Sequence, residues 1–272
     1  MTDAFIEAVL KRDRAIVAAA LVVLAGLAWA YVLWLAADVD MGGMEMSGFR
    51  MVPAGMTLMM PATAPWNATE FAFVFAMWAV MMVGMMTPSA TPMILLYTRI
   101  GRQAAQQDKP FAASSWFAGG YLLAWTGFAI VATVAQWRLE RASLLTPTMA
   151  AASGTLSGII LIAAGLYQWT PLKDACLRQC QGPLQFIQRH GGFRLDAFSS
   201  LALGARHGAY CVGCCWVLMA LLFVGGVMNV LWIAALTIFV LLEKTIPGGH
   251  VVSQVSGASL FAGGSWILVH TL

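Results

Sequence analysis

The chemistry-bearing residues of this chain are dominated by thiols. Three of its five cysteines lie in the stretch CVGCC, residues 211–215, and the other two lie four residues apart in the segment that precedes it. At about 100° per residue on a helix, the three clustered thiols and the imidazole one turn before them share about 100° of arc. The candidate ligands of this group are Cys176, Cys180, His207, Cys211, Cys214 and Cys215.

Soft thiolates favour Cu(I), which accepts two or three sulfur ligands. The cysteine spacing does not match a usual zinc ribbon or finger, although zinc remains an alternative. The competing interpretation is that buried cysteines act only as small apolar residues at a helix interface. Because the thiols are so concentrated, the sequence predicts a metal site, with copper as the favoured ion.

Methionines supply a second set of soft donors. In the stretch MWAVMMVGMM they recur at helical spacing, and another group occurs in MGGMEM, within a long loop. Buried methionines often fill gaps between helices, and a methionine-rich loop can also dock onto a bilayer. The combination nevertheless favours thioether ligands for Cu(I). The predicted thioether ligands are Met41, Met44 and Met46 in the loop and Met81, Met82, Met85 and Met86 in the helix.

The elements that hold these residues are predicted to be membrane helices. The chain of 272 residues is 60% hydrophobic and only 10% charged, whereas a soluble domain is about 25% charged. We expect an all-α bundle forming a single membrane domain, 1–272, with about seven spans and no strand pattern. The expected spans are 15–36, 71–97, 112–137, 149–169, 208–228, 229–243 and 254–271. The first is interpreted as a retained helix within 1–36, not as a cleaved signal.

Charge placement predicts the orientation. If the N-terminus is cytoplasmic, only Arg50, Arg138 and Arg141 of the 15 Lys and Arg residues lie outside, and the other twelve lie inside. Cytoplasmic loops carry this excess of positive charge. The prediction is a multi-pass membrane protein with its N-terminus inside and its C-terminus outside, and its thiols lie at the cytoplasmic end of the fifth span. They are therefore expected to stay reduced.

Four further features are predicted to shape the bundle. Pro88 and Pro92 are expected to break the second span, as in helices that line transport sites. The inner loop, 170–207, is expected to form surface helices that present Leu172, Cys176, Cys180 and Ile187 on one face. Gly204 and Gly208 are expected to admit a neighbouring backbone closely. The outer loop, 38–69, holds the first methionine group.

Polar residues near the sixth span are also candidates for function. Asn229 lies at the predicted turn before this span, and Glu243 and Lys244 lie at its end. An ionisable pair at a helix end is often an interfacial anchor with a snorkelling lysine. Alternatively, Glu243 points into the bundle and pairs with Arg206 or Arg99.

Four motifs in order, within residues 70–250, resemble a known family. They are WAVMMVGMMTPSATPM, TPLKDACLRQC, GAYCVGCCWVLMALLFVGGVMN and LLEKTIPGG. The chain resembles the bacterial domain of unknown function 2182, described as predicted metal-binding integral membrane proteins. This resemblance implies an association with copper. The signature positions that it implies are Met81, Met82, Met85, Met86, Pro88, Ser89, Pro171, Lys173, Cys176, Cys180, Cys211, Cys214, Cys215, Trp216, Met228, Asn229, Glu243 and Lys244.

The leading functional hypothesis is a membrane protein that binds Cu(I) for transport or for delivery to a membrane cuproenzyme or a periplasmic copper protein. One alternative is a thiol–disulfide oxidoreductase, and another is an assembly subunit with a structural zinc site. The expected partners are bilayer lipid and a copper protein, with no nucleic acid, and oligomerisation stays open. The residues provide no catalytic triad and no phosphate-binding loop as an energy source.

Overall fold

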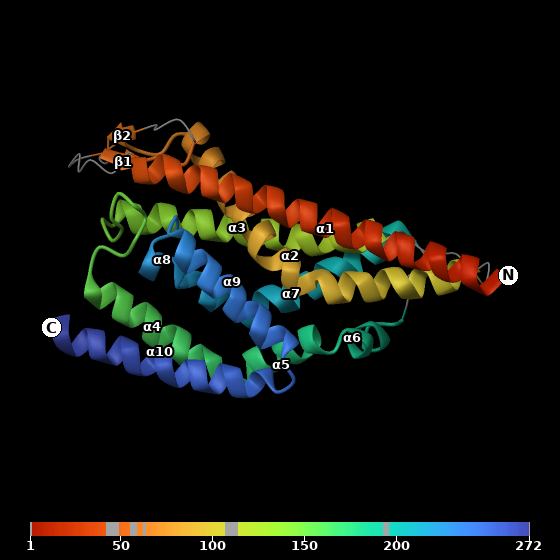
Figure 1. Ribbon diagram of the computed structural model, residues 1–272. Helices are drawn as coiled ribbons and strands as arrows, with labels where there is room; N and C mark the ends of the chain where they lie inside the picture. The colour runs from red at the N-terminus through yellow and green to blue at the C-terminus, as the bar shows by residue number, and fades with distance from the viewer. Residues whose placement is uncertain are drawn as a thin grey trace.

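The computed structural model describes residues 2–41, 49–54, 59–61, 64–106, 114–192 and 196–271. Figure 1 shows an elongated bundle of helices with a small hairpin at one end. Its elements are α1 (Thr2–Met41), β1 (Phe49–Met51), β2 (Met59–Pro61), α2 (Ala68–Gln106), α3 (Ser114–Arg141), α4 (Gly154–Gln168), α5 (Pro171–Gln181), α6 (Pro183–Arg189), α7 (Ala197–Ala220), α8 (Leu222–Gly225), α9 (Val230–Thr245) and α10 (Gly249–Thr271).

The predicted all-α membrane bundle is confirmed. By length and composition, five helical segments can cross a membrane, namely 15–38 in α1, 68–103 in α2, α3, α7 with α8, and α10. The helices α4 and α5 form a sixth candidate, bent by 66° at a short break. The remaining expected span corresponds to α9, whose 16 residues are too few to cross a bilayer. Among the described residues, five or six of the seven expected spans are therefore long enough. One antiparallel pair, β1 with β2, was not expected from the sequence.

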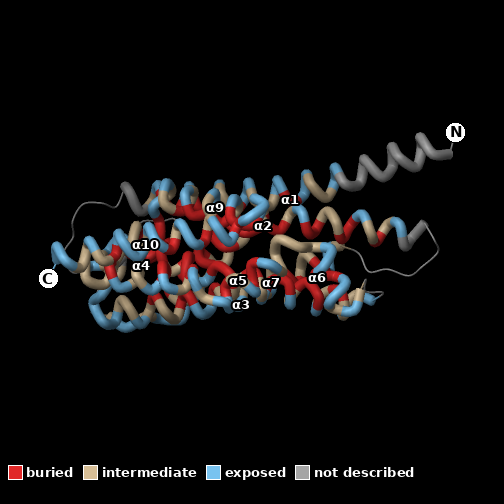
Figure 2. The backbone as a smooth tube through the Cα atoms, turned by 90° about the horizontal axis from the view of Figure 1, so that it is seen from below, coloured by how far each residue is buried: buried red, intermediate tan, exposed pale blue. Residues whose placement is uncertain are grey.

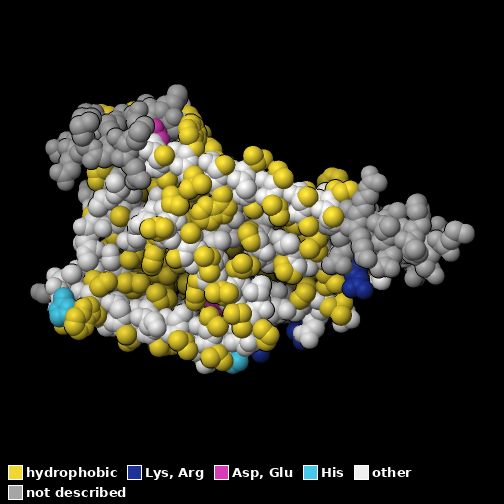
Figure 3. All heavy atoms as spheres, in the orientation of Figure 1, with side chains coloured by type: hydrophobic (Ala, Val, Ile, Leu, Met, Phe, Trp, Pro, Cys, Tyr) yellow, Lys and Arg dark blue, Asp and Glu magenta, His cyan; other side chains and the backbone are white. Residues whose placement is uncertain are grey.

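Apolar side chains cover much of the surface. In Figure 3 hydrophobic side chains spread over the face shown, and the visible Lys and Arg side chains lie in the half nearer the N-terminus. The buried residues instead follow the inward sides of the packed helices (Figure 2). An apolar exterior over several long helices is the arrangement that a lipid environment requires.

The helix that carries the three clustered cysteines begins earlier than predicted. Its first residue is Ala197, and the side chain of Asp196 caps it by accepting a hydrogen bond from the Ser199 amide at 2.8 Å. Cys211 therefore lies about 21 Å along the helix, at 1.5 Å per residue. The expectation that span five starts at residue 208, with the thiols at its mouth, is wrong.

The second span is not broken, contrary to the prediction. The helix α2 continues through Pro88 and Pro92. Hydroxyl groups beside the prolines donate hydrogen bonds to backbone carbonyls of the same helix: Thr87 to Val83 at 2.6 Å and Thr91 to Thr87 at 2.9 Å. The carbonyls that lose a backbone donor to the prolines are those of Gly84 and Pro88. The hydroxyl bonds are made one residue before each of them, and the helix continues past both prolines.

Close contact between α3 and α7 depends on glycine, as predicted for Gly204 and Gly208. A Cβ atom on Gly204 would lie 2.0 Å from the Phe117 carbonyl oxygen, and one on Gly208 would lie 2.9 Å from that of Tyr121. From the other side, a Cβ on Gly120 would lie 1.9 Å from the carbonyl oxygen of Leu201. The two backbones thus meet directly, which brings residue 121 of α3 over the middle of α7.

The inner loop forms two short helices, α5 and α6, as expected, but α5 packs against α7 and α9 in the bundle and is not a surface helix. Cys176 and Ile187 are buried there, but Leu172 is 61% exposed, so the predicted common face is only partly correct. The helix α5 contacts both α7 and α9. It is therefore packed into the bundle along the side that carries its cysteines.

Candidate metal site

The centre of the candidate site is a lysine surrounded by sulfur atoms. The Nζ atom of Lys244, near the end of α9, lies 2.9 Å from Cys211 Sγ, 3.8 Å from Cys215 Sγ and 4.0 Å from Met86 Sδ. It also lies 3.5 Å from Ser89 Oγ. The side chain of Lys244 is buried. A buried ammonium needs an electronegative partner, and the sulfur of Cys211 is the nearest one.

The thiols of α5 and α7 form a connected group around Cys211. The Cys180 thiol interacts with those of Cys211 and Cys214, and Cys211 also interacts with Cys215. The three thiols on α7 are buried, and all five cysteines of the chain are free. Cys180 therefore approaches the 211–215 cluster, and the three thiols of α7 lie within the bundle.

Two of these thiols are turned back onto their own helix. The Cys214 and Cys215 thiols donate hydrogen bonds to the carbonyl oxygen of Cys211 at 3.0 and 2.9 Å. This arrangement satisfies a protonated thiol, because only the S–H form can donate. Metal ligation by either residue therefore requires loss of that proton and rotation of the side chain.

A tyrosine that was not predicted completes the surroundings of Cys211. The hydroxyl of Tyr121, on α3, lies 3.1 Å from Cys211 Sγ and donates to the carbonyl of Met86 at 3.3 Å. Tyr121 is buried and reaches this place through the close contact of α3 with Gly208. It also links α2, α3 and α7 at the level of the thiols. In the sequence, only Gly204 and Gly208 indicated that a neighbouring helix approaches α7 at this place.

Cys176 lies at the margin of the group. A Cβ atom on Gly213 would lie 2.9 Å from Cys176 Sγ, so the missing side chain of Gly213 makes room for this thiol. The hydroxyl of Tyr167 donates to the Gly213 carbonyl from the other side. Cys176 also interacts electrostatically with Cys214. Its place is therefore between α5 and the thiol-bearing turn of α7.

His207 lies in an aromatic pocket one turn before Cys211. The centroid of its ring is 4.9 Å from that of Phe186 and 5.9 Å from those of Phe117 and Tyr121. It is buried, and its Nδ1 atom has no hydrogen-bond partner among the described residues. His207 also interacts electrostatically with Cys211. It is therefore beside the thiols, while aromatic rings fill its immediate surroundings.

Glu243 points into the bundle, but its partner is Lys173 and not Arg206 or Arg99. The Lys173 Nζ atom lies 2.7 Å from Glu243 Oε1, and both side chains are at most 1% exposed. Ser253 donates to the same oxygen at 2.5 Å. Arg206 and Arg99 are exposed. Because Glu243 is paired with Lys173, the nearest electronegative partner of the adjacent Lys244 is the sulfur of Cys211.

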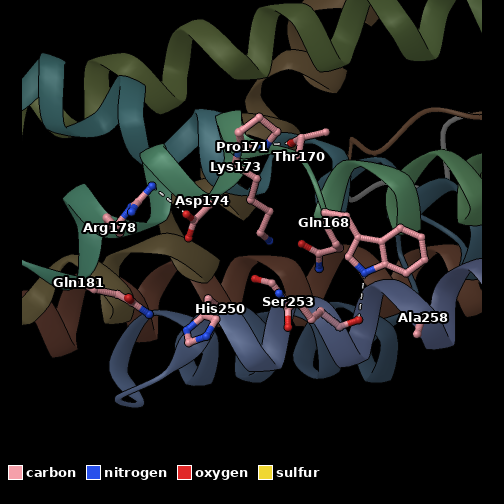
Figure 4. Close-up of a pocket in the computed structure, with 12 residues that line it drawn as sticks. Gln168, Thr170, Pro171, Lys173, Asp174, Arg178, Gln181, His250, Ser253 and Ala258 are labelled. Carbon is pink, nitrogen blue, oxygen red and sulfur yellow. Dashed lines mark hydrogen bonds and ion pairs between the residues drawn. The ribbon is translucent and has the colours of Figure 1, made fainter.

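A polar pocket lies directly beside this ion pair. Its volume is about 850 Å³, and Lys173, Gln168 and Ser253 are among the residues that line it. Figure 4 shows Lys173 and Gln168 extending into the space between α5 and α10, opposite Ser253. The Gln168 Oε1 atom is buried without a hydrogen-bond partner among the described residues. Lys173 thus lines the pocket and also pairs with Glu243, the residue before Lys244.

The predicted thioethers are only partly brought together. Met81, Met82, Met85 and Met86 are all buried, and Met86 contacts Lys244 at the thiol group. Met44 and Met46 lie outside the described residues, and the side chain of Met41, the last residue of α1, is likewise not described. Asn229 has a structural role, since its side chain caps α9 by accepting from the Trp232 amide at 3.2 Å.

The donor set fits a soft ion that needs few ligands. In the ranges that the structure describes, no group of three or more His, Cys, Asp or Glu side chains is arranged to hold a metal. Cu(I) differs from zinc in accepting two or three sulfurs, thioethers included. Cys180 interacts with Cys211, and the sulfur atoms of Cys211 and Met86 both lie within 4.0 Å of Lys244 Nζ, so the donors gathered here are of the soft type that Cu(I) prefers.

Comparison with known proteins points to the same metal. Residues 75–267, more than half of the chain, match the model of a family described as PpoB2, copper chaperone. No curated protein and no solved structure matches the chain. The description agrees with the copper association that the motif resemblance implied, although it does not carry the name domain of unknown function 2182. The chain belongs to the PpoB2 family of copper chaperones.

Proposed function

We propose that this protein carries Cu(I) on the sulfur atoms around Cys211, within its membrane bundle. The observation that supports this is the convergence of sulfur from three elements: Met86 of α2, Cys180 of α5 and Cys211 of α7. Copper handling itself follows from the family. The assignment of these residues as the ligands is the proposal.

Cys180 and Cys211 are the proposed thiolate pair, and Met86 is the proposed neutral third ligand. They come from separate helices, so their sulfur atoms can face one ion from different sides. The thiols of Cys214 and Cys215 donate hydrogen bonds to the Cys211 carbonyl. In the proposal they bind the ion only later, when it is transferred. A site in which thiols can exchange one for another suits a chaperone, because cargo must leave as well as bind.

The proposed direction of transfer uses both ends of the bundle. If the N-terminus lies in the cytoplasm, the reductants of that compartment would keep the buried thiols reduced, and the outer loop would face the periplasm. Copper would pass between these two sulfur-rich regions on its way to a membrane cuproenzyme or a periplasmic copper protein. The bilayer supplies the environment, and the protein would be placed in a bacterial inner membrane.

One observation also favours the oxidoreductase alternative. A thiol beside an ammonium is activated as a nucleophile, and Cys211 lies 2.9 Å from Lys244 Nζ. If the chain exchanged disulfides, purification without reductant would yield a Cys180–Cys211 or Cys211–Cys214 disulfide. Retention of all five thiols under these conditions, as counted by mass spectrometry after alkylation, would support copper carriage instead.

The direct test is the copper content of protein purified in detergent, loaded with Cu(I) and desalted. We expect Met86→Leu to weaken retention and Cys211→Ser to abolish it. Met77→Leu is the matched control, because Met77 is equally buried on α2 but lies nine residues earlier. Unchanged copper in Cys211→Ser would remove this site from the proposal.

A further inference from the structure

The buried lysine at the sulfur site lacks the usual partner of a buried cation. Lys244 makes no ion pair with a carboxylate in the part of the chain that the structure describes, although Glu243 is its neighbour in sequence. Glu243 is held by Lys173 at 2.7 Å, on the side of the polar pocket. The positive charge of Lys244 is therefore directed at Cys211, Cys215 and Met86.

We infer that the ammonium of Lys244 is a fixed counter-charge that makes this site select monovalent soft ions over divalent ones. The inference rests on the proposed function and adds which metal ions the site prefers. Its basis is the placement of one cation among three sulfur atoms in a buried space, at 2.9, 3.8 and 4.0 Å.

The charge of the loaded site explains the selectivity. Two thiolates carry two negative charges, which one Cu(I) and one ammonium together neutralise. Ag(I) gives the same balance. With Zn(II) between the same two thiolates, the ammonium becomes an uncompensated buried charge, which is unfavourable. The lysine thus stabilises the complex with a monovalent ion and opposes the complex with a divalent one.

Alternative roles for Lys244 predict different behaviour. If Lys244 only filled space, a neutral side chain of similar length would preserve the affinity for every metal. If it only donated a hydrogen bond to Cys211, a neutral amide would retain part of the effect. A counter-charge requires a cation, so arginine alone should replace it.

The test compares Lys244→Met, Lys244→Gln and Lys244→Arg in full-length protein in detergent. Affinities for Cu(I), Ag(I) and Zn(II) are measured by competition with chelators of known strength. Arg206→Met is the control, because Arg206 is a cation on α7, five residues before Cys211, that faces outward. Elution as a single species on size-exclusion chromatography checks that each variant is folded.

We expect both neutral variants to bind Cu(I) and Ag(I) about tenfold more weakly or worse, a loss of about 1.4 kcal/mol or more. Zn(II) affinity should stay unchanged or rise, while Lys244→Arg and Arg206→Met should keep the selectivity of the original chain. Equal losses for all three metals, or Cu(I) affinity unchanged in both neutral variants, would overturn the inference. If the unaltered protein bound no Cu(I), the proposed function would fail as well.

Discussion

Lys244 and Cys211 meet in the middle of the bundle, with the Nζ atom 2.9 Å from the sulfur, although they belong to helices α9 and α7. A second pair lies beside this contact, at the neighbouring residue of α9. Lys173 holds Glu243, and so two adjacent residues of one helix end point to different partners. The thiol group and the buried ion pair are thus coupled through the last turn of α9.

The first prediction concerns the ion pair. Replacing Glu243 with Gln leaves the Lys173 ammonium buried without its counter-charge, which should lower the free energy of unfolding by about 3–5 kcal/mol. Thermal unfolding in detergent measures the loss. The double variant Lys173→Met with Glu243→Leu should recover most of it, because neither charge is then stranded. A single variant as stable as the original would show that the pair contributes little.

The second prediction concerns the contact between α3 and α7. Gly120→Ala places a methyl group against the Leu201 carbonyl, at a distance of 1.9 Å before relaxation. The helices must separate, so stability should fall and Cys211 should become more reactive toward maleimide. Gly127→Ala in the same helix is the control, because nothing lies within 4 Å of its Cβ position. Equal behaviour of the two variants would contradict the proposed packing.

The third prediction concerns the order in which the thiols react. Cys180 is partly exposed, whereas Cys214 and Cys215 are fully buried. Brief treatment of the folded protein with a maleimide, followed by peptide mass spectrometry, should modify Cys180 first. Cys214 and Cys215 should react only after denaturation. Early labelling of Cys214 would place the 211–215 turn on the surface.

The fourth prediction concerns the Tyr121 hydroxyl. Tyr121→Phe keeps the ring and removes the group that lies 3.1 Å from Cys211 Sγ, which should cost about 1 kcal/mol of stability. It should also raise the rate of Cys211 modification in folded protein. Tyr210→Phe is the control, since its ring packs against Phe186 on the other side of α7. Identical labelling rates in both variants would remove Tyr121 from the site.

Helical patterns allowed most of the architecture to be predicted from the sequence. The length of each apolar stretch is a local property of the sequence, and it predicted the helical bundle. The spacing of Gly204 and Gly208 is also local, and it predicted the close contact between α7 and a neighbouring helix. The sequence predicts too late a start for α7, because the charged Arg206 and the polar His207 indicate the edge of an apolar span. They are consecutive residues, so they point about 100° apart. Arg206 faces outward, while His207 lies among aromatic rings.

The candidate site was only half predictable for a related reason. Cysteine spacing grouped the thiols of α7, and their number suggested that Cys180 joins them. The pairing of Glu243 with Lys173, and the approach of Tyr121, depend on how distant helices pack. No local pattern distinguishes Lys173 from Arg206 as the partner of Glu243. The continuity of α2 through Pro88 and Pro92 was not predicted either, because whether a proline interrupts a membrane helix depends on the neighbouring helices as well as on local sequence.

The most direct measurement is the Cu(I) content of the purified protein compared with that of the double variant Cys180→Ser with Cys211→Ser, under strictly reducing conditions. The account predicts stoichiometric copper in the original chain and none retained in the double variant, while both elute as folded protein. Equal copper in the two proteins would contradict the claim that sulfur atoms of α5 and α7 hold the ion together.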